Sequence, residues 1–172
     1  MKLAELNLDY ARYPNGKPPK YVKRFLLYFR LCKNFGGILG KYCRWNYWRI
    51  AERHGLEIDW NTQIGNGFFI NHAYNITINP KAIIGENCNI HKGVLIGQEN
   101  RGKREGAPVI GNRVWIGINA AIVGNVTIGD DVLIAPNSYV NCDVPSHSVV
   151  FGNPCIIKHR NNATVGYINR TV

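Results

Sequence analysis

An apolar residue returns at six-residue intervals through the middle and C-terminal part of this chain. Thirteen positions keep the interval, all but one are isoleucine, and six of them precede a glycine. These positions, called the anchors below, are Ile58, Ile64, Ile70, Ile78, Ile84, Ile90, Ile96, Ile110, Ile116, Ile122, Ile128, Ile134 and Val140. Such a period is typical of a parallel β-helix, in which short strands join at corners and successive coils stack.

A second position of the repeat supports the same fold. Four residues after an anchor the side chain is small or apolar nearly every time: Thr62, Phe68, Tyr74, Ala82, Cys88, Val94, Val114, Ala120, Val126, Val132, Ser138 and Val144. Two inward positions in six residues fit a prism whose corners carry Gly, Asn and Asp, because these residues tolerate tight turns and positive φ. The interval lengthens by two residues around Ile76-Thr77 and breaks between Gly97 and Ile110, where we predict a loop over residues 98–109.

Composition limits the remaining possibilities. A chain of 172 residues accommodates one domain, or one domain with a small appendage. The five cysteines form no Cys-x-x-Cys pair, which argues against a disulfide framework and a zinc site and fits a reducing cytoplasm. Residues 1–10 lack the apolar core of a signal peptide, and no apolar stretch approaches the length of a bilayer span. We therefore expect a cytoplasmic protein.

The positive charge is concentrated near the N-terminus. Residues 17–53 contain ten Lys or Arg and one acid, which gives +9 of the total net charge of +10. Helical spacing of Val22, Phe25, Leu26 and Phe29 predicts a helix over about 20–34, and a second is predicted over 38–54 after Gly36-Gly37. One interpretation is a helical cap on the open end of the β-helix. The other is attraction to an anionic membrane surface, at the inner face of the membrane, or to a lipid-linked phosphate. No nucleic-acid partner is expected.

At this point the residues resemble a known family. The stretch from Glu57 to Lys158 is similar to the left-handed β-helix hexapeptide acyltransferases, in particular to the serine acetyltransferase-like branch. The resemblance is carried by residues 64–72 (IGNGFFINH), 110–117 (IGNRVWIG) and 143–154 (DVPSHSVVFGNP). It implies a mainly β fold in which residues 1–56 form a helical segment, 57–158 the left-handed β-helix and 159–172 a tail. It also implies a homotrimer that binds acetyl-CoA in the groove between neighbouring β-helices.

His72 is the predicted catalytic residue. Transfer of an acetyl group from a thioester to a hydroxyl needs a base, and an imidazole with an ordinary pKa of about 6.5 suits this task at neutral pH. The resemblance places the general base of the family at His72. It places an orienting acid fifteen residues earlier, at Glu57, and Asp59 is a nearby alternative. A hydrogen-bonded corner histidine and a solvated glutamate are the simpler interpretations of His72 and Glu57.

The predicted acceptor site departs from the family pattern. Asn71 occupies the position of an Asp that binds the amino group of serine in the relatives, and Gly106 and Ala107 occupy those of an Arg and a His. A free amino acid requires charged partners of both signs. We therefore expect a neutral acceptor such as a sugar or a surface-polysaccharide precursor, with serine O-acetylation as the alternative. His91, Arg101 and Arg104 are the other predicted substrate-binding residues.

The predicted acetyl-CoA site consists of small corner residues and one cation. The resemblance assigns backbone contacts with the pantetheine arm to Gly97, Gly117, Ile118, Ala135 and Pro136, and Lys158 is predicted to meet a CoA phosphate. No metal is expected, because His72 and His91 are nineteen residues apart without a third histidine in a nearby repeat. His147 is predicted to be a structural turn residue. A β-helix that acts only as a scaffold is the non-enzymatic alternative.

Overall fold

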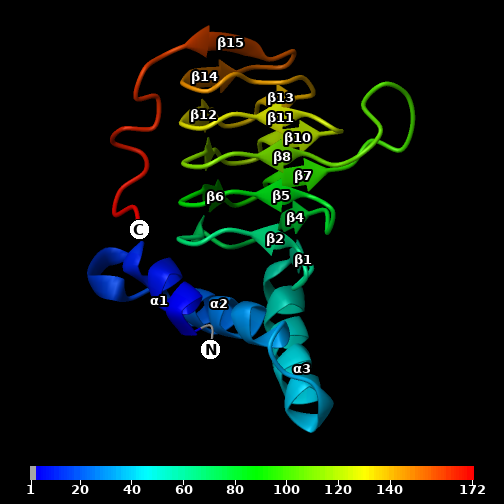
Figure 1. Cartoon of the computed structure of the whole chain (residues 1–172), viewed down its shortest axis with the longest axis vertical. Helices are drawn as coiled ribbons and strands as arrows, with labels where there is room; N and C mark the ends of the chain where they lie inside the picture. Colours follow the sequence, from blue (N-terminus) through cyan, green and yellow to red (C-terminus); the bar gives the residue numbers. More distant parts are fainter. Residues whose placement is uncertain (1–2) are drawn as a thin grey trace.

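The computed structural model describes residues 3–172. Helices occupy the N-terminal part: α1 (Leu3–Ala11), the 3-10 turn η1 (Pro14–Gly16), α2 (Lys20–Cys32) and α3 (Gly37–His54). The strands are β1 (Leu56–Ile58), β2 (Gln63–Ile64), β3 (Phe69–Asn71), β4 (Ile76–Ile78), β5 (Ile83–Ile84), β6 (Asn89–His91), β7 (Leu95–Gly97), β8 (Val109–Ile110), β9 (Trp115–Ile116), β10 (Ala121–Val123), β11 (Thr127–Ile128), β12 (Val132–Ile134), β13 (Tyr139–Val140), β14 (Ser148–Phe151) and β15 (Ile156–His159). The coils stack into a column with the helices at its base (Figure 1).

The strands form three sheets, as the six-residue period predicts for a left-handed β-helix. Sheet A has the order β1-β4-β7-β10-β13, sheet B β2-β5-β8-β11, and sheet C β3-β6-β9-β12-β14-β15. Every pairing between coils is parallel, and only β15 runs antiparallel to β14. Because the chain visits sheets A, B and C in turn, each coil has an A–B, a B–C and a C–A corner.

The anchors form the interior of the column. Their registers place one above another, as for Ile58 with Ile78 and Ile70 with Ile90, and all thirteen are at most 7 % exposed. Burying one such side chain contributes about 1.5–3 kcal/mol, so the repeat is the main stabilising element of the fold. Among the second repeat positions, the prediction that Tyr74 points inward is wrong. Tyr74 is 47 % exposed, because the longer C–A corner of the first coil turns Ala73 and Ile76 inward instead.

The two predicted helices are present as α2 and α3. Their amphipathic spacing buries Phe25 and Phe29 of α2 against Tyr47 of α3, with ring centroids 5.3 and 6.4 Å apart. Gly55 ends α3 in the left-handed conformation, with a φ of 60°. Helix α1 was not predicted, because it is short and weakly patterned.

The helices cover the open base of the column. The lowest coil has no coil beneath it, so backbone groups of β2 and β3 lack ladder partners and need others. The Arg30 guanidinium donates to the carbonyls of Ile64 (2.9 Å) and Gly65 (2.8 Å). It also forms a bidentate pair with the buried Asp9 carboxylate (2.8 and 3.0 Å), which accepts a bond from the Phe68 amide (2.9 Å).

Two residues near η1 complete this cap. Arg12, which is 1 % exposed, donates to the Gly67 carbonyl (2.6 Å) and to Asn89 Oδ1 (2.6 Å). The Tyr13 hydroxyl accepts a bond from the Ile70 amide (2.9 Å) and donates to the Ile70 carbonyl (3.0 Å). These contacts confirm the interpretation of the N-terminal segment as a cap.

The C-terminal tail returns along the column from β15 towards the base (Figure 1). Asp131 fixes its upper part by accepting bonds from Thr164 Oγ1 (2.6 Å) and from the amides of Thr164 and Ala163 (3.1 Å each). At the end of the tail, Val172 exchanges two bonds with the Asn87 side chain (2.8 and 2.9 Å). Over residues 3–172, no helix combines the length and apolar character that a bilayer crossing requires.

Candidate active site

His72 lies at the C–A corner of the first complete coil, between β3 and β4. The distance along the chain from Ile70 to Ile78 is eight residues instead of six, and His72 belongs to this enlarged corner. Its backbone has a φ of 51°, which is uncommon for a residue other than glycine. The His72 side chain is exposed. The corner therefore leaves the imidazole accessible to a substrate.

The helical cap contacts this corner directly. Tyr21 of α2 lies close to the backbone of Ala73, the residue after His72. The next side chain, Tyr74, packs against the rings of Tyr21 (5.8 Å between centroids) and His54 (4.8 Å). Residues from α2 and from the end of α3 thus hold the segment that carries His72.

A pocket of about 210 Å³ lies beside the corner, on the outer face of sheet C. The predicted substrate residues Asn71 and His91 both line it, because they are register partners on β3 and β6. Its walls come from sheet C, the N-terminal segment and the tail: Arg12, Pro14, Phe69, Asn71, Asn89, His91, Trp115, Tyr167, Asn169 and Arg170. None of these described lining residues is an Asp or a Glu.

His91 is held neutral in this pocket. Its ring packs 4.5 Å from Trp115, and Nδ1 is 2.9 Å from the Ile116 carbonyl oxygen. Because a carbonyl only accepts, Nδ1 carries the proton and Nε2 keeps a free lone pair. Burial lowers the pKa of His91, and the nearby charge of His72 lowers it further, although the bond with Ile116 opposes both. His91 therefore offers the pocket a hydrogen-bond acceptor near His72.

The two candidate orienting acids have other partners. The Glu57 carboxylate lies on the outer face of β1 and accepts a bond from Thr77 Oγ1 (3.2 Å), its register partner on β4. Asp59 accepts a bond from the Asn61 amide (2.7 Å) within a turn. Within the described chain, neither carboxylate is hydrogen-bonded to His72. The role of Glu57 stays a prediction.

The loop over residues 98–109 forms a short hairpin away from this pocket. Glu99 and Gly106 pair antiparallel with bonds of 2.9 and 3.0 Å, and Arg104 forms an ion pair with Glu99 (3.1 Å). Arg101 is exposed. The loop leaves the column at the A–B corner, where Gly97 also lies, whereas His72 is at the C–A corner (Figure 1). One copy of the chain does not bring Arg101 and Arg104 to His72.

The remaining residues of the predicted acetyl-CoA site lie higher on the column. Gly117, Ile118, Ala135 and Pro136 stack at the C–A corner above His72, and a Cβ on Gly117 would come within 2.6 Å of the Pro136 nitrogen. The amides of Gly117 and Ala135 already donate to carbonyls of the next coil (2.8 Å each), so they are not free for a ligand. Lys158 is exposed on β15, with Nζ 5.7 Å from the centroid of the Phe151 ring.

Sequence reasoning missed the part of the pocket that comes from the two ends of the chain. Arg12, Tyr167 and Arg170 carried no motif, and the tail gave no signal of folding back over sheet C. The ring of Tyr167 packs 5.1 Å from that of Trp115, and the Tyr167 carbonyl accepts a bond from Asn89 (3.3 Å). Across the described residues, no group of three or more His, Cys, Asp or Glu side chains has the arrangement of a metal site.

Comparisons with known proteins agree with the resemblance seen in the sequence. Residues 107–142 match the family described as bacterial transferase hexapeptide (six repeats). The chain is 40 % identical over 114 residues to a serine acetyltransferase of Staphylococcus xylosus. The aligned stretch covers 65 % of this chain and 52 % of the relative. It is 35 % identical over 111 residues to a serine acetyltransferase of Synechococcus elongatus, covering 64 % and 46 %. The chain thus spans about half the length of these relatives.

Solved structures extend the similarity to the helical cap. Serine acetyltransferase isoform 3 of Entamoeba histolytica, in complex with cysteine, matches 95 % of this chain and 63 % of its own, with a TM-score of 0.71 and 27 % identity. Serine acetyltransferase of Neisseria gonorrhoeae, in complex with serine, matches 90 % and 68 %, with a TM-score of 0.70 and 26 % identity. The similarity to hexapeptide transferases of the serine acetyltransferase branch is confirmed. The expected sugar acceptor receives no support from these relatives.

Proposed function

We propose that this chain is an acetyl-CoA-dependent O-acetyltransferase with His72 as its general base. The observation that carries the proposal is the exposed His72 on an enlarged corner beside a pocket, in a chain similar to serine acetyltransferases. Bound acetyl-CoA would supply the acetyl thioester. His72 takes the proton of the acceptor hydroxyl as its oxygen attacks, and returns it to the departing thiolate, so the imidazole ends unchanged.

The pocket of Asn71 and His91 is the proposed acceptor site. Asn71 is the last residue of β3 and directly precedes His72, so a hydroxyl held in the pocket is close to the imidazole. His91 Nε2 accepts a bond from an acceptor hydroxyl or ammonium group. Arg170, which is exposed at the rim, offers a cation to a carboxylate. The names of the relatives make L-serine the first acceptor to consider.

A neutral hydroxyl acceptor is the second candidate, and one observation favours it. No Asp or Glu is found among the described residues that line the pocket, and Asn71 is uncharged. The ammonium group of serine would therefore lack an anionic partner from a single chain, whereas a sugar has no such need. Glu57 and Asp59 do not fill this role, because neither lines the pocket.

A homotrimer is part of the proposal. His72 and the hairpin over residues 98–109 lie at different corners of the same prism, with sheet A between them. In a trimer of parallel columns, the A–B corner of one copy can approach the C–A corner of the next. Gly97, Arg101 and Arg104 would then reach the groove from a neighbouring copy, and Lys158 would meet a CoA phosphate from above.

Thiol release from acetyl-CoA tests the proposed function. The full chain is assayed with L-serine and with a panel of sugars and nucleotide sugars, and the acetylated product is identified by mass spectrometry. Product with L-serine supports the first acceptor, and product with a sugar alone supports the second. Absence of acetylated product from every hydroxyl acceptor would reject the O-acetyltransferase proposal and favour a scaffold.

A further inference from the structure

The capping role leaves part of the basic segment unexplained. Arg30 is hydrogen-bonded to the lowest coil and paired with Asp9. In contrast, Arg24, Arg49 and Arg53 make no ion pair with any acid in the described part of the chain. These three arginines lie on α2 and α3, the hairpin that extends beyond the base of the column (Figure 1). Unpaired cations gathered on one hairpin repel each other, and this repulsion is relieved when an anion binds.

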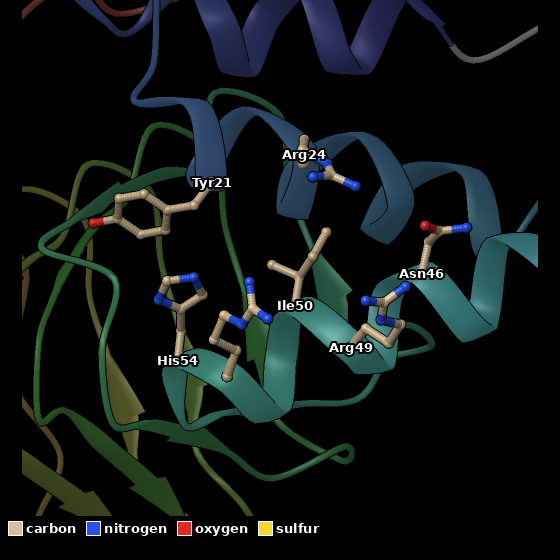
Figure 2. Close-up of a pocket in the computed structure, with 7 residues that line it drawn as sticks. Tyr21, Arg24, Asn46, Arg49, Ile50 and His54 are labelled. Carbon is tan, nitrogen blue, oxygen red and sulfur yellow. The ribbon is translucent and has the colours of Figure 1, made fainter.

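The three arginines surround one cavity of about 130 Å³. Figure 2 shows Arg24 of α2 and Arg49 of α3 on opposite walls, with Tyr21 and His54 at one end. Across its described lining no carboxylate is present, and His54 Nδ1 is buried without a hydrogen-bond partner in the described structure. Guanidinium groups bind phosphate through paired N–H donors, so the cavity has the chemistry of a phosphate site.

The N-terminal end of α3 is apolar and exposed. Ile38 is 89 % exposed, Leu39 50 %, Tyr42 54 % and Trp45 55 %, and the guanidinium of Arg49 lies 4.6 Å from the Trp45 ring centroid. Spacings of four, eleven and fifteen residues from Ile38 put Tyr42, Arg49 and Arg53 on one side of α3. We call this surface the α3 docking face; it comprises Ile38, Leu39, Tyr42, Trp45, Arg49 and Arg53. It is apolar at the tip of the α2–α3 hairpin and cationic towards the base of the column.

Composition and charge identify what covers this face. An aromatic and aliphatic surface rimmed by Lys and Arg is typical of helices that lie in a membrane interface, where Trp and Tyr occupy the headgroup level. A second copy of the same face would bring another segment of charge +9 against it, which is unfavourable. An anionic lipid surface instead attracts each cation.

We propose that the α3 docking face binds an anionic phospholipid membrane, with Arg24, Arg49 and Arg53 around a headgroup phosphate and Ile38, Leu39, Tyr42 and Trp45 in the interface. The hairpin lies on the surface and does not cross it. The corner that carries His72 contacts the α2–α3 hairpin through the rings of Tyr21 and His54, which pack against Tyr74, so the membrane holds His72 near the lipid surface.

Vesicle flotation of the full chain tests the proposal. Binding is expected to vesicles of phosphatidylcholine with phosphatidylglycerol, to weaken at high salt, and to be absent with phosphatidylcholine alone. The triple variant Arg24→Gln/Arg49→Gln/Arg53→Gln and the variant Ile38→Ser/Trp45→Ala should each lower the partition coefficient by about a hundredfold. Val165→Ser, at an exposed apolar residue of the tail, is the matched control and should float like the unmodified chain.

Three outcomes would overturn the proposal. One is the absence of flotation with phosphatidylglycerol at low salt. A second is saturable binding of inorganic phosphate to the arginine cavity without any binding to vesicles, which would assign the cavity to a soluble anion. The third is a drop in molar mass by light scattering in Ile38→Ser/Trp45→Ala, without a change in flotation, which would assign the face to a second copy.

Discussion

His72 occupies a backbone conformation that costs most residues about 1–2 kcal/mol relative to the right-handed region. The fold offsets this cost with contacts on both sides of the residue. Asn71 is fixed in sheet C by its pairing with His91, and Tyr74 packs against the rings of Tyr21 and His54 in the cap. Other corners have residues with the same left-handed backbone, such as Arg113, Asp131 and His147, so this conformation belongs to the corner geometry. What distinguishes His72 is an exposed imidazole next to the pocket of Asn71 and His91.

We expect the neighbouring residue, Asn71, to influence which acceptor the proposed site favours. Restoring a carboxylate by Asn71→Asp should raise kcat/KM for L-serine about tenfold, because one charge-assisted bond to the ammonium group is worth about 1.5 kcal/mol. The value for a neutral sugar should not rise. Steady-state thiol release with both acceptors checks this expectation.

Asn161→Asp adds the same charge at an exposed position of the tail and is the control. An equal gain from both variants would mean that overall charge, and not the pocket, sets the preference.

At the scale of elements, the cap depends on a buried ion pair. Asp9 and Arg30 join α1 and α2 to the lowest coil, and each is at most 4 % exposed. Removing one partner by Asp9→Asn or Arg30→Gln should lower the free energy of unfolding by about 3–5 kcal/mol, since it leaves a buried group uncompensated. The double variant should lose less than the sum. Chemical denaturation of the four proteins measures this coupling, and additive losses would contradict it.

The tail depends on Asp131 in a comparable way. Burial alone would raise the pKa of this carboxyl, but bonds donated by Thr164, His147 and Ala163 lower it below its ordinary value. A lowered pKa means that the stabilisation is fully present above about pH 4 and is lost as the pH falls through the pKa of the folded protein. Asp131→Asn should release residues 160–172 at neutral pH, which limited proteolysis measures. Wild-type protection of the tail in this variant would contradict the anchoring role.

How far the sequence predicts each element follows from the range of its interactions. The anchors specify the strands and sheets because each coil repeats the same local pattern, and α2 and α3 follow from spacing and glycine. The inward turn of Ala73 in place of Tyr74 was not predictable, since it depends on how two extra residues fold at one corner. A smaller part of the pocket was predictable. Asn71 and His91 come from the repeat, whereas Arg12, Tyr167 and Arg170 arrive through contacts between the chain ends and sheet C.

At the scale of the whole molecule, the corner geometry makes a prediction about assembly. Chains with His72→Ala keep the hairpin over residues 98–109, and chains whose residues 100–105 are replaced by Gly-Gly keep His72. Each should be nearly inactive alone if neighbouring copies share a site. Mixing and reassembling the two should restore part of the thiol release, because some grooves then combine an intact His72 with an intact hairpin. Activity that stays absent after verified mixing would place the whole site in one chain.

The most direct test of the account is the effect of His72→Ala on thiol release from acetyl-CoA, with the acceptor that gives the highest rate. We expect kcat to fall by at least about a hundredfold, the loss typical of removing a general base, while acetyl-CoA binding measured by calorimetry is retained. His159→Ala, at an exposed histidine on β15, should leave kcat unchanged. An undiminished kcat in His72→Ala would contradict the assignment of His72 as the base, and with it the central claim.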